Sequence, residues 1–129
     1  VGYLIAKPQI AEKIRKNIVA MSNVLAIEAA KEALNDKEFY EFSLTKNKEA
    51  KSRIYKLLDH LKLNYVKSHT NFIFFHSQKD IRDLGPKMLE KGVRIGRPFP
   101  PFYDWCRIST GTIEEVDIFI KGMLEIYES

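Results

Sequence analysis

The stretch Gly92–Thr112, GVRIGRPFPPFYDWCRISTGT, decides the fold. Two short runs in it, Val93–Gly96 and Trp105–Ser109, have the alternating or apolar composition of strands, and an aromatic-rich proline turn joins them. An arginine on a strand that leads through a Ser-Thr-Gly-Thr turn into a helix suits the binding of a carboxylate or a phosphate. The planar guanidinium can bind two oxygens at once, and a packed strand keeps it in place. The stretch carries three arginines, Arg94, Arg97 and Arg107.

Arg107 lies between Cys106 and Ile108 on the second of these runs. Successive side chains of a strand point to opposite faces, so we expect Arg107 on the outer face of the sheet if its two neighbours face the core. A structural salt bridge would explain such an arginine as well as a ligand would. Arg97, which precedes the proline turn, can equally be a loop anchor.

Composition and charge limit the class of protein. The 129 residues are 45% hydrophobic, enough for a globular domain with a real core. A net charge of +4 favours anionic partners but is well below that of a dedicated nucleic-acid-binding arm. The apolar runs are too short for a membrane span, no signal peptide is evident, and the single cysteine, Cys106, points to a reducing compartment. We therefore expect a cytoplasmic protein without a membrane partner.

The first half of the chain predicts helices. Val1–Ala6 is a β-prone apolar run without a leading methionine, which indicates a buried strand from a longer protein. Hydrophobic periodicity then predicts helices over Pro8–Val19, Val24–Asn35 and Lys37–Leu61. The last of these has a lysine-rich face, which indicates a solvated surface. The alternative, a basic patch for nucleic acid, would need interleaved aromatic residues that this face lacks.

The second half predicts a sheet and two more helices. Strands are expected at Asn64–Lys67 and Asn71–Phe75, before the two strands of the stretch Gly92–Thr112. Helices are expected to include Ile81–Leu89 and Ile113–Tyr127. Capping boxes are indicated by Ser77 with Asp80 and by Thr112 with Glu115. The order after the N-terminal helices is β-β-α-β-β-α. The fold class is therefore α+β, a small, largely antiparallel sheet with helices packed on it.

Several kinds of chemistry are not supported by the sequence. The histidines, His60, His69 and His76, lack the close pairing of a zinc site, so no metal is expected. Ser68 and His69 are adjacent on an extended segment and would point to opposite faces, which argues against a nucleophile and base. No glycine-rich phosphate loop is present. The arginines remain, and no catalytic residue is assigned.

The succession of motifs resembles a known family. Val1-Gly2-Tyr3-Leu4-Ile5-Ala6, Asn71-Phe72-Ile73, Lys91-Gly92-Val93 and above all Cys106-Arg107-Ile108-Ser109-Thr110-Gly111-Thr112 with Glu114-Glu115 are similar to the C-terminal third of class I/II pyridoxal-phosphate aminotransferases. The resemblance is closest to histidinol-phosphate aminotransferases and covers essentially the whole chain. It implies the small domain of fold type I. It also implies a division into residues 1–21, the end of the large domain with a strand and a helix, and residues 22–129, the small domain.

The resemblance implies roles for three residues. Arg107 matches the family arginine that binds the substrate α-carboxylate, and Arg97 can match the one that binds a substrate phosphate. Asn71 could line the same cleft. The family commonly has G-V-x-V-R-P, whereas Gly92–Pro98 carries one more residue, which leaves the substrate open between an amino acid and a histidinol-phosphate-like donor, with a 2-oxo acid as acceptor.

The family's cofactor lysine, pyridine-facing aspartate and phosphate-binding residues precede the segment that Val1–Ala6 resembles. The resemblance therefore implies pyridoxal 5'-phosphate in the full-length enzyme, none bound to this chain, and a chain inactive alone. A homodimer in amino-acid biosynthesis is expected. The alternative hypothesis is a freestanding basic α+β module that binds nucleic acid or another protein; we expect no nucleic-acid partner.

Overall fold

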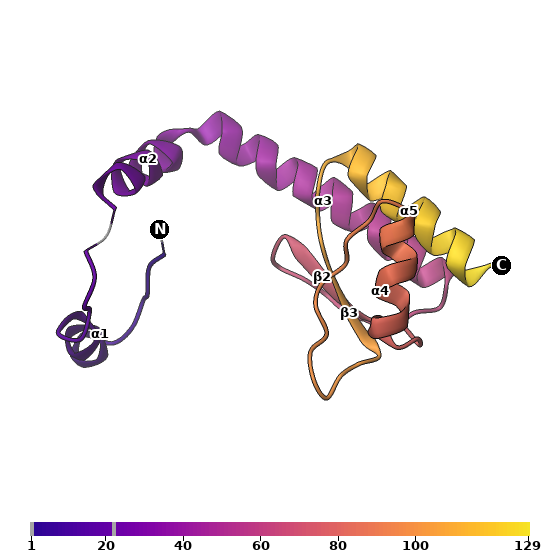
Figure 1. Ribbon diagram of the computed structural model, residues 1–129. Coiled ribbons are helices and arrows are strands. Elements are labelled where there is room, and N and C mark those ends of the chain that lie inside the picture. The colour runs from indigo at the N-terminus through magenta and orange to yellow at the C-terminus, as the bar shows by residue number, and fades with distance from the viewer. Residues whose placement is uncertain (1, 22) are drawn as a thin grey trace. The chain divides into compact units, whose positions relative to one another are not determined.

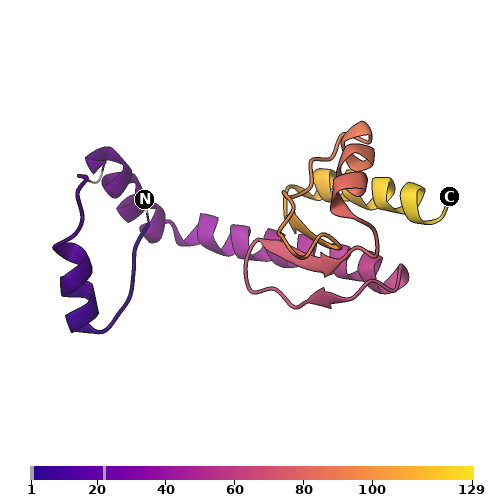
Figure 2. The ribbon, with the colours of Figure 1, turned by 60° about the horizontal axis from the view of Figure 1, so that its bottom comes forward.

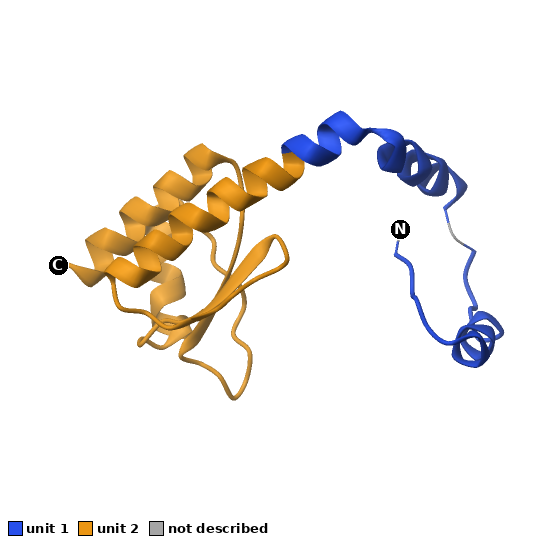
Figure 3. Ribbon diagram, turned by 180° about the vertical axis from the view of Figure 1, so that it is seen from behind, with its two compact units in different colours: residues 1–42 blue, residues 43–129 orange. Residues whose placement is uncertain are grey.

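The computed structural model describes residues 2–21 and 23–129. The chain divides into two compact units, residues 1–42 and 43–129 (Figure 3). The division between residues 21 and 22 implied by the family resemblance concerns an intact enzyme and stays a prediction.

The first unit contains helices α1, Pro8–Arg15, and α2, Val24–Asn35, and the beginning of α3, Lys37–His60. Pro8 occupies the first turn of α1, where its missing N–H is not needed. The Asn23 side chain caps α2 by accepting a hydrogen bond from the Ala26 N–H at 3.1 Å. The prediction for α2 is confirmed, whereas α1 ends four residues earlier than predicted. Neither α1 nor α2 contains a buried residue.

The strand predicted at the start of the chain is not formed. Val1 lies outside the described residues, and residues 2–6 have no strand partner in the described part of the chain. The side chains of Tyr3 and Ile5 are almost fully exposed. A strand exists only through hydrogen bonds to a neighbouring strand, so an apolar, β-prone composition alone does not produce one.

The second unit contains an antiparallel sheet of three strands, in the order β1-β2-β3 (Figures 1 and 2). The strands are β1, Tyr65–Val66, β2, Phe72–His76, and β3, Trp105–Ser109; the helices that follow β2 and β3 are α4, Ile81–Glu90, and α5, Ile113–Tyr127. In this order β2 is the central strand. The α+β class and the small antiparallel sheet are confirmed as well.

The core lies between one face of this sheet and the three helices α3, α4 and α5. The buried side chains of the strands alternate with exposed or half-buried ones, as a one-sided sheet requires. The buried cluster is contributed by α3 (Ala50, Ile54, Leu57, Leu58), the sheet (Ile73, Phe75, Cys106, Ile108), α4 (Ile81, Leu84, Met88), α5 (Val116, Phe119, Met123) and Leu63. The opposite face of the sheet is not covered by these helices and carries the candidate site.

The predicted strand Val93–Gly96 is wrong. This segment follows Gly92, which turns the chain at a φ of 82°, and its one backbone bond to β3 joins the Gly96 N–H to the Arg107 carbonyl oxygen at 2.8 Å. Pro98, two residues after Gly96, has no N–H with which to continue the hydrogen bonding to β3. The order is therefore β-β-α-β-α. The predicted alternation is still present, since Val93 and Ile95 pack against the core while Arg94 is exposed.

The two predicted capping boxes have different outcomes. At α5 the box is formed, with the Thr112 hydroxyl and the Glu115 carboxylate each accepting the other's backbone N–H. At α4 the cap is Asp80, which accepts from the Arg82 N–H at 2.8 Å. Ser77 is instead buried, and its hydroxyl donates to the carbonyl oxygens of Lys79 and Asp104. The helix starts at Ile81 and includes Pro86 in its interior.

Candidate anion-binding site

Arg107 stands on the outer face of the sheet, as the alternation predicted. Its neighbours Cys106 and Ile108 are buried in the core. In the pairing of β3 with β2, Arg107 lies opposite Phe74. Its guanidinium carbon lies 5.5 Å from the ring centroid of Phe72 and 5.3 Å from that of Phe99. Aromatic rings therefore support the cation on a packed strand.

No carboxylate neutralises Arg107 within the described residues. Ten ion pairs within 4.0 Å are formed there, and Arg107 belongs to none of them. The alternative that this arginine serves a structural salt bridge is therefore not realised. A guanidinium has five N–H donors in a planar fork, which suits the two oxygens of a carboxylate.

Arg97 reaches the same aromatic ring from a different segment. Its guanidinium carbon is 4.6 Å from the Phe99 centroid, and one N–H donates to the Pro98 carbonyl oxygen at 3.3 Å. The side chain thus holds its own loop, as the anchor interpretation predicted. The Phe99 ring is also contacted by Arg107. The two predicted arginines therefore share one aromatic ring.

Asn71 lies at the adjoining end of the sheet. Its carbonyl oxygen accepts hydrogen bonds from the Thr110 N–H at 2.8 Å and from the Thr110 hydroxyl at 2.9 Å. The same hydroxyl is within 3.0 Å of Asn47 Oδ1 on α3. These contacts fix the turn that begins directly after Ser109, the last residue of β3. The structure shows a backbone role for Asn71, and its side-chain role in a cleft stays a prediction.

The rings that contact the arginines were not predicted from the sequence. Phe74 stacks on Trp105 at 5.0 Å between centroids, and its ring meets Phe99 edge to face at 5.8 Å. The period-2 alternation of β2 could have placed Phe72 and Phe74 beside Arg107. Phe99 belongs to an irregular loop, and no local pattern indicates where its ring lies.

His76 closes the other end of this face. Its Nε2 lies 2.8 Å from Asp104 Oδ2, and its ring meets Trp105 edge to face at 5.6 Å. His76 therefore ties the end of β2 to the loop before β3. In the described part of the chain, no three His, Cys, Asp or Glu side chains come together in a way that could hold a metal ion.

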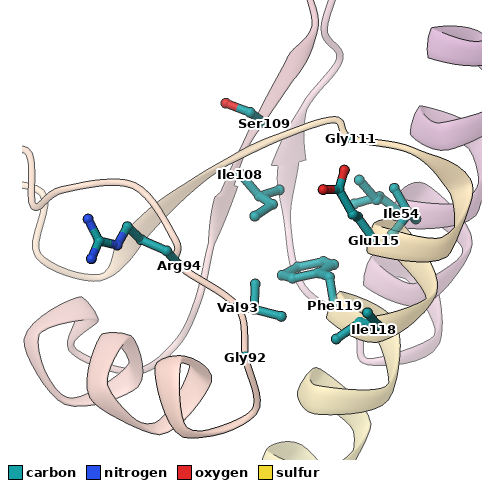
Figure 4. Close-up of a pocket in the computed structure, with 11 residues that line it drawn as sticks. Ile54, Gly92, Val93, Arg94, Ile108, Ser109, Gly111, Glu115, Ile118 and Phe119 are labelled. Carbon is teal, nitrogen blue, oxygen red and sulfur yellow. The ribbon is translucent and has the colours of Figure 1, made fainter.

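A hollow of about 210 Å³ lies on the core side of β3, behind the aromatic face. Figure 4 shows it between the Gly92–Arg94 segment, the end of β3 and the beginning of α5. Its walls are mainly apolar, with Val93, Ile108 and Phe119 among them. The Glu115 carboxylate at its edge is engaged in the capping box. Arg107 does not line this hollow.

The cysteine and the lysine-rich face provide no competing site. Burial raises the pKa of the Cys106 thiol to about 12, so it stays protonated and unreactive. On α3, Lys46 pairs with Glu49, and the Lys51 ammonium donates to the carbonyl oxygens of Ser68 and Thr70 at 3.1 and 3.0 Å. Two lysines of this face, Lys46 and Lys51, therefore have partners within the domain, which does not favour the nucleic-acid alternative.

Comparison with known proteins identifies the family. The model of the family "Aminotransferase class I and II" matches residues 1–123. The chain belongs to the class I and II aminotransferases. It is 35% identical over 98% of its length to a histidinol-phosphate aminotransferase of Moorella thermoacetica and spans 33% of that protein. The chain thus spans about a third of the length of the curated relatives that it matches.

Solved aminotransferase structures share the fold. A putative histidinol-phosphate aminotransferase from Erwinia carotovora atroseptica superposes with a TM-score of 0.86 and 32% identity, covering 96% of this chain and 36% of that one. The histidinol-phosphate aminotransferase of Sinorhizobium meliloti, solved with pyridoxal-5'-phosphate, covers 74% of this chain and 27% of its own at a TM-score of 0.67. At 24% identity this second likeness concerns the fold alone.

Among the described residues no helix is both long and apolar enough to cross a membrane.

Aminotransferases of this family depend on pyridoxal phosphate, and the lysines described here do not fit its Schiff base. Such a lysine needs a desolvated position that lowers its pKa. Every described lysine except Lys51 is exposed, and Lys51 is held by two carbonyl oxygens. Lys91 shows the opposite effect, because the Glu125 carboxylate raises its pKa. The described part of this aminotransferase chain thus offers the cofactor no fitting lysine.

Proposed function

We propose that this chain is the substrate-binding small domain of a pyridoxal-phosphate-dependent aminotransferase and that Arg107 binds the substrate carboxylate. One observation carries the proposal: the Arg107 guanidinium stands on the outer face of the sheet, supported by rings and with no carboxylate partner among the described residues. The family membership supplies the reaction class, transfer of an amino group from an amino donor to a 2-oxo acid.

The contribution of Arg107 is to bind and orient. A guanidinium that binds both carboxylate oxygens fixes the direction of the Cα–H bond, and proton removal requires that direction to be correct. The strand holds the backbone of Arg107, and Phe72 and Phe99 restrict its side chain. Pyridoxal phosphate supplies the electron-withdrawing ring in such enzymes. The lysine for it comes from outside this chain in our proposal.

Arg97 is proposed to bind a second acidic group of the substrate. Its guanidinium shares the Phe99 ring with Arg107, and one of its N–H groups is engaged by Pro98, which leaves further donors. The relatives named histidinol-phosphate aminotransferases act on a donor that carries a phosphate. A phosphate or a side-chain carboxylate of an amino-acid donor would both suit Arg97. Asn71 in the cleft and a homodimeric enzyme remain part of the proposal.

The test replaces Arg107 by glutamine in the intact enzyme. Loss of a charge-assisted, partly desolvated contact costs about 3 kcal/mol, so kcat/KM for the amino donor should fall by about a hundredfold. The matched control is Arg94→Gln, because Arg94 is an exposed arginine of the same stretch outside the aromatic face. It should leave kcat/KM almost unchanged. Equal kinetics for Arg107→Gln and the parent enzyme would refute the proposal.

A further inference from the structure

Phe99 is the one ring that contacts both arginines among the described residues. Arg97 lies on the loop after Gly96 and Arg107 on β3, ten positions later, yet their guanidinium carbons are 4.6 and 5.3 Å from the Phe99 centroid. Arg107 has a second ring, Phe72, at 5.5 Å, whereas Arg97 has no other ring partner in the described residues. Removing the Phe99 ring would therefore affect both cations at once.

The Phe99 ring is itself held in place. The backbone of Phe99 forms an isolated antiparallel bridge with Phe102, whose N–H donates to the Phe99 carbonyl oxygen at 2.7 Å. The Phe99 ring is in T-shaped contact with the ring of Phe74, which in turn stacks on Trp105. A ring held by a tight turn and by the aromatic side chains of the sheet can transmit the position of the sheet to the loop.

The shared ring also limits the distance between the two cations. Because each guanidinium carbon lies close to one centroid, the two carbons can be no more than about 10 Å apart. No described carboxylate forms an ion pair with either arginine. Two positive charges within about 10 Å of each other, neither paired with a described carboxylate, favour a ligand that carries two negative groups.

We propose that Phe99 is the positioning residue for both arginines and that, through it, the loop and β3 together select a ligand with two acidic groups. The inference rests on the proposed function, in which Arg107 binds the carboxylate, and adds to it the residue that sets the second binding position. It assigns a role in specificity to a hydrophobic side chain that need not touch the reacting atoms.

The positioning role can be tested in the 129-residue chain without activity. A guanidinium close to an aromatic ring experiences its ring current. The chemical shifts of the Nε–H resonances of Arg97 and Arg107 should therefore differ from those of exposed arginines. Arginine-to-lysine variants assign the two resonances. Phe99→Leu should move both resonances toward the exposed position, and Phe99→Tyr should keep them. Phe102→Leu is the matched control, since Phe102 lies in the same loop, is 55% exposed and stacks on neither arginine.

The specificity role is tested by titrating the same chains with glutarate, which has two carboxylates, and with butyrate, which has one. Phe99→Leu should weaken glutarate binding by about tenfold and butyrate binding by about threefold, because two cation–ring contacts act on the first ligand and one on the second. Phe99→Tyr and Phe102→Leu should bind both as the parent chain does. The amide resonances of β2 and β3 show whether the sheet is intact, and Phe99→Met replaces Phe99→Leu if it is not.

The outcomes separate this inference from the proposed function. If Arg107→Gln abolishes glutarate binding while Phe99→Leu and Phe99→Met leave both the affinity and the arginine resonances unchanged, the positioning role is wrong and the carboxylate role stands. Should Arg107→Gln bind as the parent chain does, or should the parent chain bind neither anion, the proposed function fails and this inference with it.

Discussion

The backbone of Gly96 touches the backbone of Arg107. The Gly96 N–H donates to the Arg107 carbonyl oxygen at 2.8 Å, and a Cβ on residue 96 would lie 2.7 Å from that oxygen and 3.1 Å from the Arg107 Cβ. A side chain at position 96 has no room, since real Cβ atoms do not approach a carbonyl oxygen so closely. Glycine thus lets the loop that carries Arg97 run against the strand that carries Arg107.

Gly96→Ala should therefore destabilise the protein and disturb the anion site. The extra methyl group must push the loop away from β3, and overpacking of this kind costs about 1–3 kcal/mol in the free energy of unfolding. Urea denaturation followed by circular dichroism measures the loss. Gly2→Ala is the control, because nothing lies within 4 Å of a Cβ there, and it should change stability by less than about 0.5 kcal/mol. Equal midpoints for the two variants would contradict the steric argument.

Local patterns predicted what depends on local physics. The bounds of α2 follow from a 3.6-residue period that is visible in the sequence. The outward direction of Arg107 follows from the two-residue period of a strand between Cys106 and Ile108. These features do not depend on distant parts of the chain.

Features that depend on a distant partner were missed or wrong. Residues 2–6 and 93–96 have strand-like composition, but a strand also needs a neighbour, and the sequence does not show one. The spacing of Ser77 and Asp80 suits a capping box, yet the Ser77 hydroxyl bonds to the carbonyl oxygens of Lys79 and Asp104, so Asp80 caps the helix instead. The convergence of Arg97 and Arg107 on Phe99 depends on the path of an irregular loop.

The capping box of α5 gives a second prediction. The Thr112 hydroxyl accepts from the Glu115 N–H at 3.3 Å, and the Glu115 carboxylate accepts from the Thr112 N–H at 2.8 Å. Thr112→Ala should lower the free energy of unfolding by about 1 kcal/mol, and Thr112→Ser should lower it by much less. The exposed Thr45 inside α3 is the control, since its change to alanine removes no cap and slightly favours the helix. A Thr112→Ala midpoint equal to that of Thr45→Ala would show that the box is dispensable.

The cap of α4 predicts a pH dependence. Hydrogen bonds from the Arg82 side chain and backbone lower the pKa of the Asp80 carboxyl from 3.8 to about 2. Because the pKa is lower in the folded state, the ionised cap stabilises α4 fully above about pH 4, and this contribution is lost as the pH falls toward 2. Carbon-13 NMR of the carboxyl group should show Arg82→Gln raising the Asp80 pKa toward its ordinary value. Lys87→Gln, which removes a charge elsewhere on α4, should leave it low; an Asp80 pKa near 3.8 in the parent chain would contradict the assignment.

Truncation tests where the stability of the chain resides. All buried residues among those described lie between Ala50 and Met123, within the second unit. The first 42 residues carry most of the large exposed hydrophobic side chains, such as Ile5, Val19 and Leu25. A surface of this kind favours association with another surface. We therefore expect residues 1–42 to promote self-association and to contribute little to the folding of the second unit.

A chain that begins at Ser43 should unfold cooperatively with a urea midpoint close to that of the full chain, because no core side chain is removed. Analytical ultracentrifugation should show the truncated chain monomeric at concentrations where the full chain forms larger species. The matched control ends at Gly111 and so removes α5 with the core residues Val116, Phe119 and Met123, and it should lack a cooperative transition. If the chain from Ser43 also unfolds without cooperativity, residues 1–42 are needed for the fold, and the assignment of stability to the second unit is wrong.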